Sequence, residues 1–228
     1  MIAGKTKKSK EEKEKEKAPE DKPPEESTDE SSAEEQNIFM EAIASAQKPV
    51  HMTGLYGDVN ETKAQEAIYS LLLFQKDIMH SPAPVDEDAE PENIEFYVST
   101  FGGQASEMFA VYDVMRMVRD NVPVVTMGLG KVMSAGVLLL ASGTKGARRI
   151  GKHCRVMIHG VNSGHSGYIA DMENEFNETK FTQKQYVAAL AAETDMSPAY
   201  IRKLMAKKTN VYLDAQQAVD LGIADIIV

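Results

Sequence analysis

The sequence has very little cysteine, no tryptophan and no long hydrophobic segment. Its 228 residues include one cysteine, Cys154. A single cysteine excludes an intramolecular disulfide and a zinc site built from several cysteines, which fits a reducing compartment. No apolar stretch approaches the length of a membrane span. We therefore expect a chain without a membrane segment, with the cytoplasm as the default location.

Basic charge is also scarce. Lys and Arg number 25 against 35 Asp and Glu, which gives a net charge of −10. Binding to phosphates requires basic patches, so this balance argues against a nucleic-acid partner. The five histidines do not have metal-ligand spacings of the HExxH kind. We expect neither a metal ion nor a cofactor.

Aromatic residues are absent from the first 36 residues. Lys and Glu alternate from Lys7 to Lys17, and Pro, Glu and Ser dominate after that. Such a composition cannot bury enough apolar surface to offset chain entropy. No apolar core follows the basic start, so this is not a secretory signal. We predict a disordered tail at residues 1–36 and one folded domain at residues 37–228.

The folded part alternates between strand-like and helix-like segments. The predicted strands span residues 48–53, which end in a Gly-Leu-Tyr-Gly turn, then 94–99, 122–126 and 155–159. The predicted helices span residues 61–79, 105–119, 133–142, 169–193 and 197–208, and an acidic, Pro-rich loop spans 80–93. This order predicts an α/β fold with parallel strands and crossover helices.

The stretch from Val122 to Gly146 organises the chain. A β-branched strand is followed by a glycine-rich segment at residues 128–133, which we interpret as a turn, and then by an apolar helix that Gly143 is placed to cap. Ser134 would lie in the first turn of that helix, where free N–H groups and a partial positive charge favour a nearby oxyanion. A role as helix cap alone is an equal alternative.

Four residues follow predicted parallel strands and should share one edge of the sheet: Gly102, Gly103, Ser134 and His159. A serine nucleophile needs a base to take its hydroxyl proton, and an imidazole is suited to that task. The glycine pair could bring backbone N–H groups close to an oxyanion. A lone histidine at a strand end is more often structural, so the hypothesis depends on its coincidence with Ser134.

From about Val50 to the C-terminus, the sequence resembles the ClpP-type caseinolytic serine peptidases. The segments that carry the resemblance are STFGG, MSAGVLLLASGTKGARR, RVMIHG and YLDAQQAVDLGIAD. The resemblance implies the ClpP/crotonase fold, a parallel sheet of ββα-type units with a protruding handle helix. It also implies Ser134 as nucleophile, His159 as general base, and the N–H groups of Gly103 and Ala135 as the oxyanion hole.

The resemblance further implies partners. It predicts a homo-oligomer of two stacked heptameric rings that enclose a chamber, fed with unfolded polypeptides by a hexameric AAA+ unfoldase. The helix at 169–193 corresponds to the handle that interlocks two rings. The glycine-rich segment before it, residues 161–167, corresponds to the strand that pairs across rings and binds peptide.

The sequence departs from the family pattern in four places. The segment at residues 128–133 is about two residues longer, Thr100-Phe101 replaces Ser-Pro, and the loop at 80–93 is extended. At the third triad position the family's aspartate corresponds to Asn210, which can orient the imidazole but lacks the charge that stabilises imidazolium. Asp214 is the alternative carboxylate, but its spacing to Gln217 is typical of a capping box. Asn210 therefore predicts weakened activity.

Three functions are compatible with these residues. The first is a self-compartmentalised serine endopeptidase. The second is a weak or inactive subunit with a structural or regulatory role in a mixed ring. The third is a crotonase-like acyl-CoA enzyme, which shares the fold but needs no Ser–His pair. We favour the peptidase because Ser134 and His159 both occupy the positions that it requires.

Overall fold

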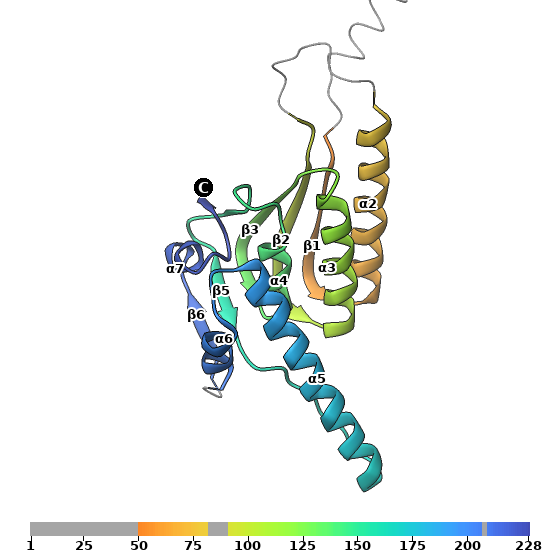
Figure 1. The fold of residues 1–228 in the computed structure, drawn as a ribbon, viewed down its shortest axis with the longest axis vertical. Coiled ribbons are helices and arrows are strands. Elements are labelled where there is room, and N and C mark those ends of the chain that lie inside the picture. The colour runs from red at the N-terminus through yellow and green to blue at the C-terminus, as the bar shows by residue number, and fades with distance from the viewer. Residues whose placement is uncertain (1–49, 82–90, 207–208) are drawn as a thin grey trace, which may run out of the picture. The chain divides into compact units, whose positions relative to one another are not determined.

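The computed structural model describes residues 50–81, 91–206 and 209–228 (Figure 1). The predicted tail at residues 1–36 and most of the predicted loop at 80–93 lie outside the described residues. The strands are β1 (Met52–Val59), β2 (Ile94–Gly103), β3 (Val124–Met133), β4 (Arg149–Ile150), β5 (Arg155–Ile158), β6 (Val211–Leu213) and β7 (Ile226–Ile227). The helices are α2 (Glu61–His80), α3 (Ala105–Arg119), α4 (Ala135–Ala141), α5 (Ile169–Glu193), α6 (Pro198–Met205) and α7 (Ala215–Asp220).

The strands form one sheet, and the predicted parallel α/β architecture is confirmed. β1, β2, β3, β4 and β7 are neighbours in that order, and all are parallel. β3 has two partners on one side, because its middle pairs with β4 and its end pairs with β5. β6 then pairs with β5 in the antiparallel direction. The branch at β3 brings the ends of β3 and β5 together.

The long helices lie where the apolar periodicity predicts them. The predicted ranges 105–119 and 169–193 match α3 and α5, and α2 ends one residue later than predicted. The expected apolar face of α3 is buried: Met108, Val111, Tyr112 and Met115. In the described residues no helix is both long enough and apolar enough to cross a membrane.

Two glycine-containing segments that the sequence predicts as turns are strands instead. Gly54 and the residues up to Gly57 lie inside β1, and residues 128–133 form the end of β3. A Cβ at Gly54 would lie 2.4 Å from the carbonyl oxygen of Tyr97, and one at Gly128 would lie 3.0 Å from the side chain of Leu140. Glycine is therefore needed at Gly54 and Gly128 for close packing rather than for chain reversal.

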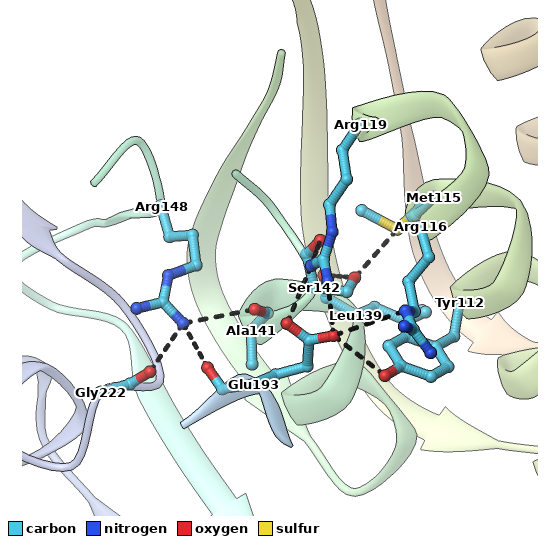
Figure 2. A network of polar contacts seen from close by, with 10 residues as sticks. All are labelled: Tyr112, Met115, Arg116, Arg119, Leu139, Ala141, Ser142, Arg148, Glu193 and Gly222. Carbon is cyan, nitrogen blue, oxygen red and sulfur yellow. Dashed lines mark hydrogen bonds and ion pairs between the residues drawn. The ribbon is translucent and has the colours of Figure 1, made fainter. Parts of the chain in front are cut away.

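A buried carboxylate fixes the C-terminal end of α5 (Figure 2). The Glu193 side chain is 2% exposed. It accepts a hydrogen bond of 2.9 Å from the Tyr112 hydroxyl and two of 2.8 Å from the Arg119 guanidinium. Both donors belong to α3. The contact therefore ties the end of α5 to the face of α3.

Arg148 extends the same network to the last strand. Its Nη1 atom donates to the carbonyl oxygens of Ala141, Glu193 and Gly222, at 3.3, 2.7 and 2.8 Å (Figure 2). Its Nε atom donates to Asp225 at 2.8 Å. The anchored end of α5 thus lies in the body of the fold, whereas its first half extends away from the sheet (Figure 1).

Candidate active site

Ser134 has a strained backbone at the junction of β3 and α4. Its φ is 54° and its ψ is −119°. Among the described residues, it is the one non-glycine residue with a positive φ. That conformation is costly for a residue with a Cβ, so the surrounding structure must hold it. The Ser134 N–H donates to the Met157 carbonyl at 2.8 Å, and the Ser134 carbonyl accepts from the Val137 N–H at 3.0 Å. Ser134 is the N-cap residue of α4, just before the predicted first turn.

The Ser134 side chain points to a histidine rather than to its own helix. It makes no capping hydrogen bond to α4, so the interpretation of Ser134 as only a helix cap is wrong. Its Oγ lies 2.8 Å from Nε2 of His159. His159 follows β5, and β5 pairs with the end of β3 so that Met157 lies opposite Met133. Strand register therefore brings the two side chains together.

The glycine pair at the end of β2 lies against the serine. A Cβ at Gly102, whose φ is 104°, would lie 2.5 Å from the Cβ of Ser134. A Cβ at Gly103 would lie 2.2 Å from the carbonyl oxygen of Val59. The Gly102 N–H donates to Thr100 Oγ1 at 2.9 Å, which fixes the end of β2. Glycine is needed at both positions because any side chain would displace β1 or the serine.

A cavity of about 650 Å³ opens at this edge of the sheet. Ser134, His159 and both predicted oxyanion donors, Gly103 and Ala135, line it. Apolar and hydrogen-bonding side chains share its remaining wall, among them Asp58, Asn60, Phe101, Met108, Asn162 and Tyr186. Such a mixed wall suits an extended polypeptide, whose side chains need apolar pockets and whose backbone needs donors and acceptors.

Asn210, the predicted third residue, lies directly before β6. β6 is antiparallel to β5, with Val211 opposite Ile158, so one further step of this register would put Asn210 opposite His159. In the parts of the chain described here, no hydrogen bond joins Asn210 to the His159 ring. The Asp214 side chain accepts from the Gln217 N–H at 2.8 Å in a complete capping box. Its use as a helix cap argues against Asp214 as the carboxylate.

The thiol of Cys154 is not among the described groups that line the cavity. Cys154 is buried, and burial raises the pKa of its thiol to about 11, so it stays protonated near neutral pH. Within residues 50–81, 91–206 and 209–228, no group of three or more His, Cys, Asp or Glu side chains is placed to hold a metal ion. Among the described residues, Ser134 and His159 form the hydrogen-bonded hydroxyl–imidazole pair in the cavity.

Sequence reasoning did not single out Tyr186, one of the residues that line the cavity. Tyr186 lies in α5, is 5% exposed, and donates from its hydroxyl to the Ser134 carbonyl oxygen at 3.1 Å. The two residues are 52 positions apart. The apolar stripe at Val187 and Leu190 indicates that this turn of α5 packs on the domain, but no local pattern indicates what the hydroxyl contacts.

Comparison with known proteins identifies relatives of the described part of the chain. The family described as Clp protease matches residues 50–228. The ATP-dependent Clp protease proteolytic subunit 2 of Treponema pallidum (strain Nichols) is 31% identical over 171 residues, which are 74% of this chain and 77% of that protein. The ATP-dependent Clp protease proteolytic subunit 4 of Rhodococcus jostii (strain RHA1) is 27% identical over 167 residues, which are 73% of this chain and 81% of that protein.

Proposed function

This chain belongs to the Clp protease family, and from that membership we propose that it is a serine endopeptidase subunit that hydrolyses unfolded polypeptides. The observation that carries the proposal is the 2.8 Å contact between Ser134 Oγ and His159 Nε2 inside the cavity. A crotonase-like acyl-CoA enzyme needs no such pair, and the matching family is one of proteases. Both observations disfavour that alternative.

In the first half of the proposed reaction, Ser134 Oγ attacks the scissile carbonyl carbon. The Oγ proton passes to His159 Nε2, and the carbonyl oxygen becomes an oxyanion that the N–H groups of Gly103 and Ala135 stabilise. Collapse of this intermediate breaks the C–N bond. The imidazolium gives its proton to the leaving amine, and an acyl group remains on Ser134.

In the second half, water replaces the amine. His159 takes a proton from that water, the resulting hydroxide attacks the ester carbonyl, and the proton returns to Ser134 as the acid product leaves. Asn210 would orient the imidazole by accepting from its Nδ1–H. Because an amide carries no charge, the imidazolium is stabilised less than by aspartate, and we expect a slower enzyme.

We also propose that subunits assemble into two stacked heptameric rings fed by a hexameric AAA+ unfoldase in the cytoplasm. The described relatives are named as ATP-dependent proteolytic subunits. The exposed half of α5 supports a contact between copies, because it carries large apolar side chains in solvent: Ile169, Met172, Phe176 and Phe181. Apolar side chains gathered on a helix that extends from the fold are typical of an interaction surface.

A second candidate role is that of a catalytically weak subunit in a mixed ring. The observation that favours it is the amide, in place of a carboxylate, at position 210, which the register of β5 and β6 would put opposite His159. The two roles predict different reactivity at Ser134.

Reaction with a fluorophosphonate probe tests the proposed function. We expect the assembled protein to gain one probe adduct per subunit, mapped to Ser134 by peptide mass spectrometry. Ser134→Ala should lose the adduct and keep its melting temperature and oligomer mass. Ser99→Ala, which removes a half-buried hydroxyl from the neighbouring strand, is the matched control and should label normally. Failure of the assembled wild type to label would move the inactive-subunit role ahead.

A further inference from the structure

The Tyr186 hydroxyl reaches the backbone of the candidate nucleophile. Tyr186 is in the last part of α5 that packs on the domain, and its ring is part of the core. The Tyr186 hydroxyl donates to the carbonyl oxygen of Ser134 at 3.1 Å. The acceptor belongs to the peptide unit that joins Ser134 to Ala135.

That peptide unit carries one of the predicted oxyanion donors. A peptide group is planar, so the direction of the Ser134 C=O fixes the direction of the Ala135 N–H on its opposite side. Rotation of this plane would turn the Ala135 N–H away from the cavity. The positive φ of Ser134 makes the present orientation strained, so contacts on the carbonyl are needed to hold it.

Two donors hold the Ser134 carbonyl from different directions. The Val137 N–H, at 3.0 Å, belongs to the first turn of α4, and the Tyr186 hydroxyl belongs to α5. A carbonyl oxygen has two lone pairs, so both hydrogen bonds can form together. Burial raises the pKa of Tyr186 well above its ordinary value of 10.0, which keeps the hydroxyl protonated and able to donate.

We propose that Tyr186 is a positioning residue that orients the Ser134–Ala135 peptide plane so that the Ala135 N–H faces the oxyanion. This role rests on the proposed peptidase function. It also makes α5, whose other end is exposed, part of the support of the catalytic geometry. In this role Tyr186 acts through the Ser134 backbone, not through the transferred proton.

The Tyr186→Phe variant tests the role, because it removes the hydroxyl and keeps the ring in the core. We expect kcat on a short fluorogenic peptide to fall about fivefold to tenfold with KM nearly unchanged. The loss should be smaller than the 10²–10³ that follows removal of an oxyanion donor itself, because the Ala135 N–H is still present. Tyr112→Phe is the matched control. It removes another buried hydroxyl, the one bound to Glu193, and should leave kcat unchanged.

A pair of inhibitors separates positioning from packing. A peptide aldehyde forms a tetrahedral adduct with the serine and has its oxygen in the oxyanion hole, whereas the matching peptide alcohol binds without that adduct. Tyr186→Phe should weaken binding of the aldehyde about fivefold to tenfold and leave binding of the alcohol unchanged. A loss of core packing alone would weaken both equally or neither.

The outcomes distinguish the two proposals. If the wild type labels with fluorophosphonate, and Tyr186→Phe keeps the kcat and the aldehyde-to-alcohol ratio of the wild type, then the positioning role is wrong and the peptidase function stands. If the wild type neither labels nor binds the aldehyde, the proposed function fails, and the role of Tyr186 in it fails as well.

Discussion

The proposed role of Asn210 as the third triad residue leads to a prediction about the strength of the general base. Asn210→Asp would give the His159 imidazolium a charged partner, so kcat/KM on a short fluorogenic peptide should rise. The gain should lie between a few-fold and the roughly 10⁴-fold loss that the reverse change causes in a related triad. The upper figure is a ceiling, because a site adapted to asparagine does not supply every donor that an ionised carboxylate needs.

Asp214→Ala is the control for this prediction. It removes the other nearby carboxylate together with the α7 cap, so it should cost about 1 kcal/mol of stability and little activity. Oligomer mass is measured for each variant, so that altered assembly is not mistaken for altered chemistry. A large loss of activity in Asp214→Ala, with no gain in Asn210→Asp, would make Asp214 the orienting residue.

At the residue scale, the sequence predicts the meeting of Ser134 with His159 but not the contact with Tyr186. Both predicted residues directly follow buried strands, and parallel strands end at a common edge, so their proximity follows from topology. Their catalytic roles stay predictions. The Tyr186 contact depends on how α5 packs against α4 and α6. No periodicity in the sequence encodes which acceptor a buried hydroxyl meets.

The contact between α4 and β2 leaves no room for a side chain at Gly136. A Cβ at this position would lie 2.4 Å from Cγ2 of Thr100. Alanine is intrinsically better than glycine in a helix by about 1 kcal/mol, but the overlap should outweigh that gain. We expect Gly136→Ala to lower the free energy of unfolding by about 1–3 kcal/mol, measured by urea denaturation.

Two further variants test whether the overlap is the cause. Thr100→Ser removes the obstructing methyl group and keeps the hydroxyl that accepts from the Gly102 N–H. The double variant should therefore recover most of the stability lost in Gly136→Ala. Gly164→Ala, at a position with nothing within 4 Å of the added Cβ, should change stability by less than about 0.5 kcal/mol. Additive effects of Thr100→Ser and Gly136→Ala would contradict this explanation.

At the element scale, helices were more predictable than strand ends. α3 and α5 have the predicted bounds because apolar spacing and flanking residues act locally. β3 runs to Met133, past Gly128 and Gly130, because its end pairs with β5 and with β2. Local sequence makes those glycines look like a turn. The pairing partners that extend the strand are distant in sequence, so the pattern alone could not reveal them.

At the scale of the whole molecule, two partly buried ion pairs, Arg119–Glu193 and Arg148–Asp225, connect α3, α5 and the segment that ends in β7. Burial raises the pKa of Glu193, but hydrogen bonds and charge from Arg119, together with the Tyr112 hydroxyl, outweigh this and hold it below the ordinary 4.5. Burial acts in the same way on Asp225, and Arg148 holds that pKa below the ordinary 3.8. Both carboxylates are therefore ionised in the folded protein at neutral pH.

These lowered pKa values predict loss of stability in acid. A carboxylate with a lowered folded pKa stabilises fully above its unfolded pKa, and the contribution disappears as pH falls through the folded value. We expect the urea midpoint to fall steadily from about pH 5 to pH 3. Glu193→Gln should lower the free energy of unfolding at pH 7 by about 3 kcal/mol and flatten the acid dependence.

Asp113→Asn is the matched control for Glu193→Gln. Asp113 is an exposed carboxylate beside Tyr112 on α3, so its neutralisation should leave both the stability at pH 7 and the acid dependence nearly unchanged. An equally steep acid dependence in Glu193→Gln would show that Glu193 is not responsible for it.

The buried residues of α5 all lie between Tyr186 and Glu193, so the helix resembles a rod that is fixed over its last two turns and free at its other end. Ile169 and Tyr186 are separated by a helical rise of about 26 Å, so a tilt of about 5° would move the tip by about 2 Å. The same tilt would hardly displace the tyrosine hydroxyl, which lies beside the pivot. A small bend at the exposed tip should therefore leave the position of Ser134 nearly unchanged. Sliding of α5 along its length, or rotation about its axis, would move the Tyr186 hydroxyl and with it the Ser134–Ala135 peptide plane.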